Sequence, residues 1–518
     1  MAATSANSVL LYIFSWLGLV VFSSLLKYLI GKTRSTKRTE TPLSPPSLPI
    51  IGHLHLIGSV IPKSFHALSK LYGPLIHLRL GASTCILVSN VQVAKQVLKT
   101  NEINFINRPH FGSSEYYLYK GFNFVTAPYG PYWRFMKKLC MTQLLSSSQL
   151  GRFMHIREQE IKKLLKSLVD CSSEGRECDL CFELTTLTNN ILCRMAMSTT
   201  CLDKDKNSND DANEIHGLVK EFMELAAKLS IGEVLGPLGK LDIFGYGKKL
   251  FKTLSRFDQI LERIMEEHEN NKCDDHEGET WDMMDVLLQV YNHPNAQERL
   301  TRNHIKGFFL DIFLAGTDTT SVALLWTMAE ILNRPTVLKK LRPEIDAVVG
   351  STRLVNESDV PKLPYLQAVV KEALRLHPSA PLVLREAVED CMINGYNIKK
   401  QTRTIINVYA VMRDPEAWAN PEEFIPERFL EATDHLSKMS VNDVKYVPFG
   451  FGKRGCPGAS LALTVINVTV ASLIQCFNWR IKGGDKVNME EGSSFSTGLA
   501  QPLVCYPLTC FNPFSLSP

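Results

Sequence analysis

The sequence has little net charge of either sign, and this absence narrows the classes of function. Lysine and arginine number 57 against 53 aspartate and glutamate residues, which leaves a formal charge of +4 over 518 residues. An excess this small does not indicate a nucleic-acid-binding surface. The hydrophobic fraction of 45% and the charged fraction of 21% are typical of a globular protein and exclude a disordered chain.

The sequence also lacks the cysteine pattern of a disulfide scaffold. Its 13 cysteines are odd in number and irregularly spaced, which argues against complete pairing. Cys178 and Cys181 have the CxxC spacing, but no second pair or histidine lies near them, so a zinc site is not predicted there. In a cytosolic protein most cysteines, Cys193 among them, are expected to be reduced and buried.

Charged side chains are absent from residues 1–26, which contain an apolar run close to the ~20 residues that span a membrane. Lys27 can extend this run by placing its ammonium group at the membrane surface. Four basic residues follow at positions 32–38 and place that flank in the cytosol. A cleaved signal peptide would begin with a cationic segment and have a shorter apolar centre. We therefore expect residues 1–30 to form a retained, single-pass membrane anchor.

Residues 31–52 lack helix-forming sequence. They carry the basic cluster and then a stretch in which four of the eight residues 42–49 are proline. Because proline has no amide hydrogen to donate and clashes with the preceding helical turn, we predict a stiff, extended linker.

The remaining residues 53–518 show no internal repeat and no break strong enough to divide them. Apolar residues recur at helical spacing over most of residues 91–378, whereas residues 75–89 and 404–408 have strand-like patterns. We therefore predict one body that is mainly α-helical with small β-sheets.

One cysteine has neighbours that a structural cysteine does not need. Cys456 lies in residues 448–458, PFGFGKRGCPG, with four glycines, two prolines and two cations. The glycines permit tight turns and the close approach of a flat group. A helix predicted to begin after Gly458, together with Arg454, would lower the pKa of the thiol.

A thiolate in this position suits either a nucleophile or a metal ligand. No histidine lies in the surrounding stretch to act as the base for a nucleophile, although a histidine distant in the sequence keeps that alternative open. As a single axial ligand, a thiolate provides what a haem iron needs for cleavage of an O–O bond.

The pattern Phe449-x-x-Gly452-x-Arg454-x-Cys456-x-Gly458 resembles the haem-binding signature of the cytochrome P-450 superfamily, the haem-thiolate monooxygenases. The resemblance implies the cytochrome P-450 fold and haem b, iron protoporphyrin IX, as the cofactor. It implies that Cys456 is the axial ligand of the iron and that Phe449 and Arg454 help to bind the haem. The alternative is an ordinary glycine-rich turn.

A second motif, AGTDTT, occupies residues 315–320 within a long apolar segment. Glycine and threonine both weaken a helix interior, so a local distortion of the helix is expected. The motif resembles the oxygen-binding part of the family's central helix. That resemblance implies that Asp318 and Thr319 relay protons and that Gly316 leaves room above the haem. Taken alone, the motif is equally compatible with a helix interior that contains polar threonines.

Glu372 and Arg375 lie three residues apart in KEALR and therefore share one face of a predicted helix. An exposed pair at this spacing is common and contributes only a few tenths of a kcal/mol. Together with Arg428 in PERF, however, the two residues resemble the family's Glu-x-x-Arg and PERF elements. The resemblance implies a buried structural network near the cysteine loop.

Trp133 and Lys137 resemble the family's Trp-x-x-x-Arg helix, whose arginine meets a haem propionate. Lys137 stands in the arginine position and offers charge without a bidentate fork, so its propionate contact stays open. Trp133, Arg385 and Arg454 are the better candidates for binding the propionates. The alternative is a core tryptophan beside surface cations.

These motifs, with the anchor and linker before them, cover essentially the whole chain and resemble plant microsomal members of the family. Residues 53–518 would then be the catalytic domain, facing the cytosol from the membrane of the endoplasmic reticulum. Electrons from NADPH would arrive through NADPH-cytochrome P-450 reductase, with cytochrome b5 as an optional partner. Because Asp318 and Thr319 are both present, a monooxygenase is favoured over an isomerase.

The segments that correspond to the family's substrate-recognition regions are apolar and aromatic, which suits a large, weakly polar and lipophilic substrate. They contain Phe111, Tyr116, Tyr117, Phe122, Phe124, residues 308–315, Leu382, Val383, Phe495 and Leu499. The subgroup resemblance favours a pentacyclic triterpenoid, with a friedelin-type methyl group as one target. A flavonoid or isoflavonoid is the alternative substrate, and a membrane haem-binding protein without turnover is the alternative class.

Overall fold

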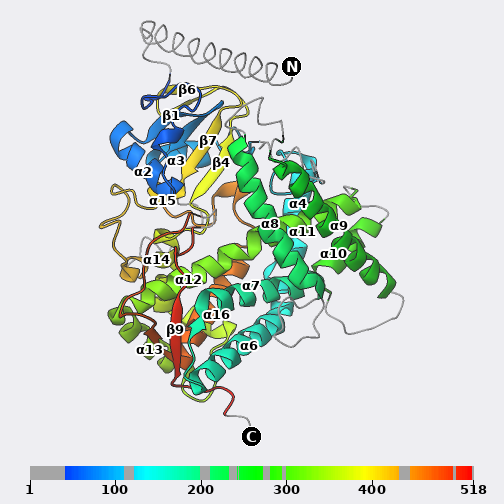
Figure 1. Cartoon of the computed structure of the whole chain (residues 1–518), viewed down its shortest axis with the longest axis vertical. Coiled ribbons are helices and arrows are strands. Elements are labelled where there is room, and N and C mark those ends of the chain that lie inside the picture. Colours follow the sequence, from blue (N-terminus) through cyan, green and yellow to red (C-terminus); the bar gives the residue numbers. More distant parts are fainter. Residues whose placement is uncertain are drawn as a thin grey trace, which may run out of the picture.

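The computed structural model describes residues 41–109, 119, 122–198, 210–232, 242, 244–271, 281–293, 299–430, 444–493 and 497–515. The predicted membrane anchor at residues 1–30 lies outside the described residues. Within them the molecule is mainly helical with small sheets, as predicted (Figure 1). The helices are α2 (Ile61–Tyr72), α3 (Val91–Lys95), α4 (Pro131–Leu139), α5 (Ser147–Arg152), α6 (Met154–Ser173), α7 (Leu180–Met197), α8 (Asp210–Gly232), α9 (Tyr246–Asn271), α10 (Met283–Asn292), α11 (Arg302–Gly316), α12 (Asp318–Leu332), α13 (Pro335–Val349), α14 (Pro364–Leu376), α15 (Val408–Val411) and α16 (Ala459–Cys476).

The largest sheet among the described residues has the strand order β1-β2-β7-β4 and lies beside α2 at one end of the molecule (Figure 1). Strand β1 is antiparallel to β2, and β4 is antiparallel to β7, whereas β2 and β7 run parallel. The predicted strand pair is confirmed, and Gly81 in its turn has a φ of 63°, which favours glycine. The strands are β1 (Leu75–Leu80), β2 (Ser83–Val88), β3 (Cys178–Asp179), β4 (Leu382–Glu386), β5 (Cys391–Ile393), β6 (Tyr396–Ile398), β7 (Arg403–Asn407), β8 (Phe477–Ile481) and β9 (Val504–Thr509).

The described part of the predicted linker, residues 41–52, pairs with β1. Leu43 forms a β-bridge with Ile76, and Gly52 forms one with Leu80. Gly52 has a φ of 63°, and a Cβ atom at this position would lie 2.1 Å from the carbonyl oxygen of Arg79. Proline keeps this segment from forming a helix, but it does not prevent the backbone from pairing at the edge of a sheet.

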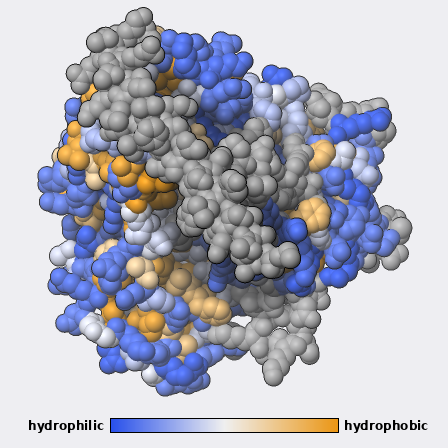
Figure 2. All heavy atoms as spheres, turned by 45° about the horizontal axis from the view of Figure 1, so that its top comes forward, coloured by the Kyte–Doolittle hydropathy of each residue, from blue (hydrophilic) through white to orange (hydrophobic). Residues whose placement is uncertain are grey.

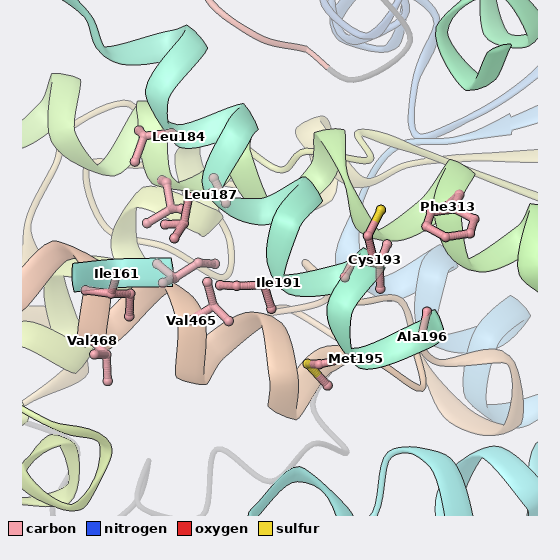
Figure 3. Packing of buried hydrophobic residues seen from close by; sticks show 14 of the residues in the cluster. Ile161, Leu184, Leu187, Ile191, Cys193, Met195, Ala196, Phe313, Val465 and Val468 are labelled. Carbon is pink, nitrogen blue, oxygen red and sulfur yellow. The ribbon is translucent and has the colours of Figure 1, made fainter. Parts of the chain in front are cut away.

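The main hydrophobic core lies between the long helices. Figure 3 shows Leu187 and Ile191 of α7 facing Ile161 of α6 and Val465 of α16. Helices α12 and α16 are apolar around most of their circumference because neighbouring helices cover them on several sides. This packing holds the helix that carries AGTDTT and the helix that follows Cys456 in one rigid body.

Two helical segments of the described chain are long and apolar enough to cross a membrane. They are Arg302–Leu332, which comprises α11 and α12, and Ala459–Cys476, which is α16. Their apolar windows are 61% and 67% buried within the protein. Both are therefore core helices of this body.

The cysteines of the described residues are mostly free. Ten are reduced, and Cys85, Cys140 and Cys476 among them are buried, as expected. Cys193, by contrast, is disulfide-bonded, so the expectation of a reduced thiol is wrong at this position.

Candidate active site

The cysteine loop presents Cys456 just before α16. Gly450 and Gly452 have φ values of 73° and 63°, which side chains rarely tolerate. The Cys456 amide donates to the carbonyl of Phe449 at 2.9 Å, and the Gly455 amide donates to the carbonyl of Gly452 at 2.9 Å. The loop therefore folds back on itself and holds the cysteine in a defined position.

Cys456 is exposed, although burial raises the pKa of its thiol above the ordinary value. The sulfur therefore has free surface but is surrounded by other groups of the protein. The Gly458 amide, Lys137 and Arg108 act to lower the pKa, but burial outweighs them. The pKa lowering predicted from the helix start and Arg454 is therefore wrong for the free thiol. A metal ion bound to the sulfur would deprotonate it regardless.

The central helix is interrupted between Gly316, the last residue of α11, and Asp318, the first residue of α12. The hydroxyl of Thr317 donates to the carbonyl of Phe313 at 2.8 Å. The hydroxyl of Thr188 on α7 donates to the carbonyl of Thr317 at 3.2 Å. Side-chain hydroxyls thus take up backbone carbonyls at the break, and the predicted distortion of the helix is confirmed.

Thr319 lies in the first turn of α12, directly after this break. Its hydroxyl donates to the carbonyl of Ala315 at 2.6 Å, and the hydroxyl of Ser379 donates to the carbonyl of Thr319 at 2.8 Å. Ala315 is exposed, although α11 lies among other helices (Figure 1). Ala315, like Cys456, therefore has a free surface.

Asp318 follows Thr317 but faces a different side of α12 from Thr319, since consecutive helical residues are about 100° apart. It lines a groove between α7, α12 and residues 498–502, with Cys181 also in the wall. The groove holds about 860 Å³ of empty space and is partly open to solvent. The charge of Asp318 reaches His216 on α8, where it opposes the lowering of the pKa by burial. Asp318 therefore has its own route to water.

Three arginines, Arg108, Arg385 and Arg454, crowd together beside the cysteine loop. Arg385 and Arg454 are only 3% and 8% exposed. Burial, with the charges of Arg108 and Arg454, lowers the pKa of Arg385 to about 9. Burial, with the charge of Arg108, lowers the pKa of Arg454 to about 10. The Nε atom of Arg108 is buried without a hydrogen-bond partner.

No ion pair joins these three arginines to a carboxylate within the part of the chain that the structure describes. Glu102 partly offsets the lowered pKa of Arg385, but its carboxylate accepts from the Lys453 amide at 2.5 Å. Burying cations without paired anions is costly. The cluster is therefore complementary to an anionic ligand.

The donor set fits iron protoporphyrin IX, which carries two propionates. Cys456 offers a free, exposed thiol, and the charge of Arg108 interacts both with this thiol and with Asp311 of α11. Arg108 thus lies between the cysteine loop and the central helix. The sequence did not identify Arg108 as a haem-binding candidate, because no local pattern connects it with Cys456.

Trp133 of α4 is buried and holds Arg454 in place. The Arg454 guanidinium lies 4.5 Å from the centroid of the indole ring, on which Phe124 stacks at 5.8 Å. Arg454 also donates to the carbonyls of Ile106 and Ala127. Trp133 therefore orients a cation of the cluster, and Phe124, expected near the substrate, is packed in the core.

Lys137 lies one helical turn after Trp133 on α4. Its Nζ donates to the carbonyl oxygen of Gly455 at 2.8 Å, so the ammonium group is committed to the cysteine loop. Phe449 is half-buried and packs against the main core. Both side chains therefore support the loop that carries Cys456.

Glu372 and Arg375 of α14 are fully buried and form an ion pair, with 2.7 Å between Arg375 Nε and Glu372 Oε2. The Nε atom of Arg428 lies 3.0 Å from Glu372 Oε1. Arg375 also lies over the ring of Trp418 at 5.2 Å, and Trp418 donates to the carbonyl of Lys445 at 3.3 Å. The structure thus brings the three predicted residues together and connects them to the chain just before the cysteine loop.

The predicted substrate-recognition segments are described only in part. Phe111, Tyr116, Tyr117 and Phe495 lie outside the described residues. Half-buried side chains from these segments are Phe122, Leu382, Val383 and Leu499. In residues 308–315, Phe308, Phe309 and Phe313 are buried in the core, whereas Ala315 is exposed. Most aromatic side chains of that segment therefore serve packing.

Comparison with known proteins gives a consistent set of matches. A family model described as Cytochrome P450 matches residues 42–506. Cytochrome P450 93A3 of Glycine max is 43% identical over 96% of this chain and 97% of its own length. The 3,9-dihydroxypterocarpan 6A-monooxygenase of Glycine max is 42% identical over 96% and 98%. Beta-amyrin 24-hydroxylase of Glycine max is 42% identical over 93% and 95%.

A solved structure of a zebrafish cytochrome P450 with progesterone superposes on this chain with a TM-score of 0.71. It is 26% identical in sequence, and the match covers 86% of this chain and 99% of that structure.

Proposed function

Because the chain belongs to the cytochrome P450 family and is a monooxygenase, we propose that it oxidises a lipophilic plant metabolite at a haem held by Cys456. The observation that carries this proposal is the exposed, free thiol of Cys456 beside the cluster of Arg108, Arg385 and Arg454, which forms no ion pair with a carboxylate among the described residues. A thiolate-ligated haem needs this combination of one soft ligand and several cations.

In this proposal the sulfur of Cys456 ligates the iron, and Arg108, Arg385 and Arg454 hold the propionates. Trp133 keeps Arg454 in position, and Glu372, Arg375 and Arg428 form the buried scaffold behind the loop. When bound, the haem supplies the activation of molecular oxygen, and the thiolate donates electron density that favours O–O cleavage. The electrons come from NADPH through a partner reductase, with cytochrome b5 as an optional second donor.

The acid and the alcohol at the helix break have separate tasks. Asp318 lines a groove that is partly open to solvent, so its carboxylate can take up a proton from water. Thr319 carries a hydroxyl beside exposed Ala315, and Ser379 holds its carbonyl. We assign proton uptake to Asp318 and proton delivery towards the haem to Thr319.

The substrate is assigned from the character of the lining and of the relatives. One relative is named for oxidation of a dihydroxypterocarpan and another for oxidation of beta-amyrin, at the same 42% identity. Of the four half-buried side chains in the described recognition segments, Leu382, Val383 and Leu499 are aliphatic and Phe122 is aromatic. This mainly aliphatic character suits a large hydrocarbon skeleton. We therefore propose a pentacyclic triterpenoid, with a friedelin-type methyl group as one target, and a flavonoid or isoflavonoid as the second candidate.

We further propose that the protein sits on the endoplasmic reticulum membrane through residues 1–30, with the catalytic domain in the cytosol. Large apolar side chains are exposed close to this end of the chain, namely Leu43, Leu48, Ile50, Ile51 and Ile61. In Figure 2 the end of the molecule that carries the largest sheet is turned toward the viewer, and apolar residues are exposed on the left of the view. Exposed apolar side chains of this kind suit contact with lipid.

Expression of the full chain with a plant reductase in yeast that makes triterpenes tests the assignment. Flavonoids are fed to parallel cultures, and products are profiled by mass spectrometry. Absence of product from both sets would exclude both substrate classes. NADPH consumption without any product would instead favour the non-catalytic haem-binding class.

The reduced protein under carbon monoxide tests the ligand separately. We expect the red-shifted Soret band of a thiolate-ligated haem, and its loss in Cys456→Ala. Thr319→Ala should keep the band but consume more NADPH per product formed. A wild-type protein without the band would contradict the haem-thiolate assignment.

A further inference from the structure

Trp326 of α12 connects the central helix to a segment near the end of the chain. Its side chain is only 1% exposed, and its indole Nε1 donates to the carbonyl oxygen of Thr497 at 2.6 Å. Thr497 begins a stretch, residues 497–502, that we call the groove wall, because residues 498–502 line the groove together with Asp318. Leu499, one of the half-buried side chains of the recognition segments, belongs to this wall. The helix that carries Asp318 therefore also holds another side of the groove.

The groove wall has few other attachments to α12. Among the described residues, no other hydrogen bond joins α12 to residues 497–502. Two backbone hydrogen bonds of 2.8 Å, from the amides of Gly492 and Ala500, connect the wall to residues 490–492 or within that pairing instead. Within the described part of the chain, the buried hydroxyl of Thr497 has no hydrogen-bond partner, so it does not anchor the wall. The bond from Trp326 is therefore the polar contact that fixes the wall to the central helix.

The indole ring of Trp326 is itself held in place. The imidazole of His377 lies flat on it, with 3.9 Å between the ring centroids and 4° between the ring planes. His377 is fixed in turn, because its Nε2 lies 2.6 Å from Oε1 of Glu330, one helical turn after Trp326 on α12. Two residues after His377, the hydroxyl of Ser379 donates to the carbonyl of Thr319. One short segment therefore braces both the turn that carries Thr319 and the anchor of the groove wall.

Another tryptophan of this protein serves packing alone. Trp479 of β8 packs against Phe477 with 5.5 Å between the ring centroids, and among the described residues its buried Nε1 has no hydrogen-bond partner. Removing this N–H group should therefore have no effect on the groove wall. At Trp326, by contrast, the same loss leaves the carbonyl of Thr497 without its donor. Thr497 is only 8% exposed, and an unpaired acceptor is unfavourable at a buried position.

We propose that Trp326 is a positioning residue that fixes Leu499 relative to the central helix and thereby determines how well bulky ligands fit beside the haem. The proposal rests on the proposed function, because it assumes a haem at Cys456 and a ligand site lined by Leu499. A side chain that shapes a site is placed only as well as the contacts that support it. Without the bond from Trp326, the groove wall should open more often, and Leu499 should lose its defined position.

The test uses the full-length, haem-loaded protein as wild type, as Trp326→Phe and as Trp479→Phe, which is the matched control. A further form carries benzothienylalanine at position 326. It replaces the N–H group by sulfur, keeps both rings and serves where Trp326→Phe does not fold. Hydrogen exchange followed by mass spectrometry reports on a peptide that covers residues 490–502 and on one from β1 and β2. Spectral titration of the ferric haem gives the dissociation constants of imidazole, which is small, and of clotrimazole, which carries bulky aryl groups.

Both forms altered at position 326 should exchange the amides of residues 490–502 about tenfold faster than wild type, equivalent to about 1.4 kcal/mol. The peptide from β1 and β2 should be unchanged. Clotrimazole should bind about tenfold more weakly, which is again about 1.4 kcal/mol. Imidazole should bind as it does to wild type, because it is too small to reach the groove wall from the iron. Trp479→Phe should match wild type in all of these measurements.

Unchanged exchange of residues 490–502 in both forms altered at position 326 would mean that the bond to Thr497 does not hold the wall. Equally faster exchange in the peptide from β1 and β2, or the same changes in Trp479→Phe, would mean a general loss of stability. An equal loss of affinity for both azoles would mean a disturbed haem, and unchanged clotrimazole affinity despite faster local exchange would separate Leu499 from ligand binding. Each of these outcomes would overturn the proposal. A wild-type protein that shows no spectral shift with imidazole would instead overturn the proposed function.

Discussion

Replacing Arg385 by methionine tests whether the arginine cluster is built for an anion. Burial and the charges of Arg108 and Arg454 lower the pKa of Arg385 to about 9. At roughly 1.4 kcal/mol per pKa unit, this corresponds to a penalty of about 4–5 kcal/mol on the charged guanidinium, as an upper bound. Methionine removes this penalty and gives up the hydrogen bond to the Leu384 carbonyl, worth about 1 kcal/mol. The haem-free protein should therefore become more stable by a few kcal/mol.

With haem bound, the same substitution should have the opposite effect. Arg385→Met removes a charged hydrogen bond to a propionate, worth about 1.5–3 kcal/mol. We expect haem to transfer to an excess of apomyoglobin at least about tenfold faster than from wild type. Arg385→Lys keeps a positive charge and should behave like wild type more closely in both measurements. Thermal unfolding with and without haem, followed by circular dichroism, gives the two stabilities.

The direction of the change in stability without haem, and of the change in the rate of haem transfer, tests whether the arginine cluster binds an anion. A haem-free Arg385→Met protein that is less stable than wild type would mean that the guanidinium is already satisfied without an anion. An unchanged rate of haem transfer would mean that Arg385 does not meet a propionate. Either result would refute the reasoning.

Three further changes have defined outcomes. Glu372→Ala leaves two buried arginines without their shared carboxylate, which should cost about 3–5 kcal/mol; the yield of soluble, haem-loaded protein measures it, and a normal yield would contradict the network. Burial lowers the pKa of His268, but the hydrogen bond and charge of Asp282 outweigh it and raise the pKa to about 9. The stabilising charged pair is complete below pH 6.5 and is lost as the pH rises through 9. The unfolding temperature of the wild type should therefore fall between pH 6 and pH 9.5, and that of His268→Gln should fall less over the same interval. Equal falls would exclude a stabilising contribution from the His268–Asp282 pair. Ser379→Ala removes the donor to the Thr319 carbonyl and should increase hydrogen peroxide formed per NADPH, with the carbon monoxide band unchanged; an unaltered peroxide ratio would separate Ser379 from proton delivery.

Local sequence was sufficient for features whose cause is local. The left-handed φ values of Gly450 and Gly452 shape the cysteine loop, and glycine at these positions is visible in the sequence. The break after Gly316 follows from threonine hydroxyls that take backbone carbonyls within their own turn. The predicted hairpin at Gly81 has the same kind of cause.

Other features depend on causes that are not local. A helix start and a nearby arginine predicted a lowered pKa for Cys456, but burial by other segments dominates. The proline-rich composition predicted a stiff, extended linker but not its partner, which is the edge of β1 where Leu43 pairs with Ile76. The aromatic residues of the recognition segments predicted a substrate lining, but the side chains of Phe124 and Phe308 are buried in the main hydrophobic core. In each case the environment of the residue is set by an element that is distant in the sequence.

The sequence by itself determined that this chain carries a glycine-bounded cysteine before a helix, an acid and an alcohol in a weakened helix, and a glutamate and an arginine on one helix face. These features depend on spacings of a few residues, which the amino-acid order specifies directly. Only the tertiary structure decided that Arg108 joins Arg385 and Arg454, that Lys137 holds Gly455, and that Asp318 turns to the solvent-open groove. The physical reason is that charge, burial and access to water are set by segments hundreds of residues apart, which meet only when the helices pack.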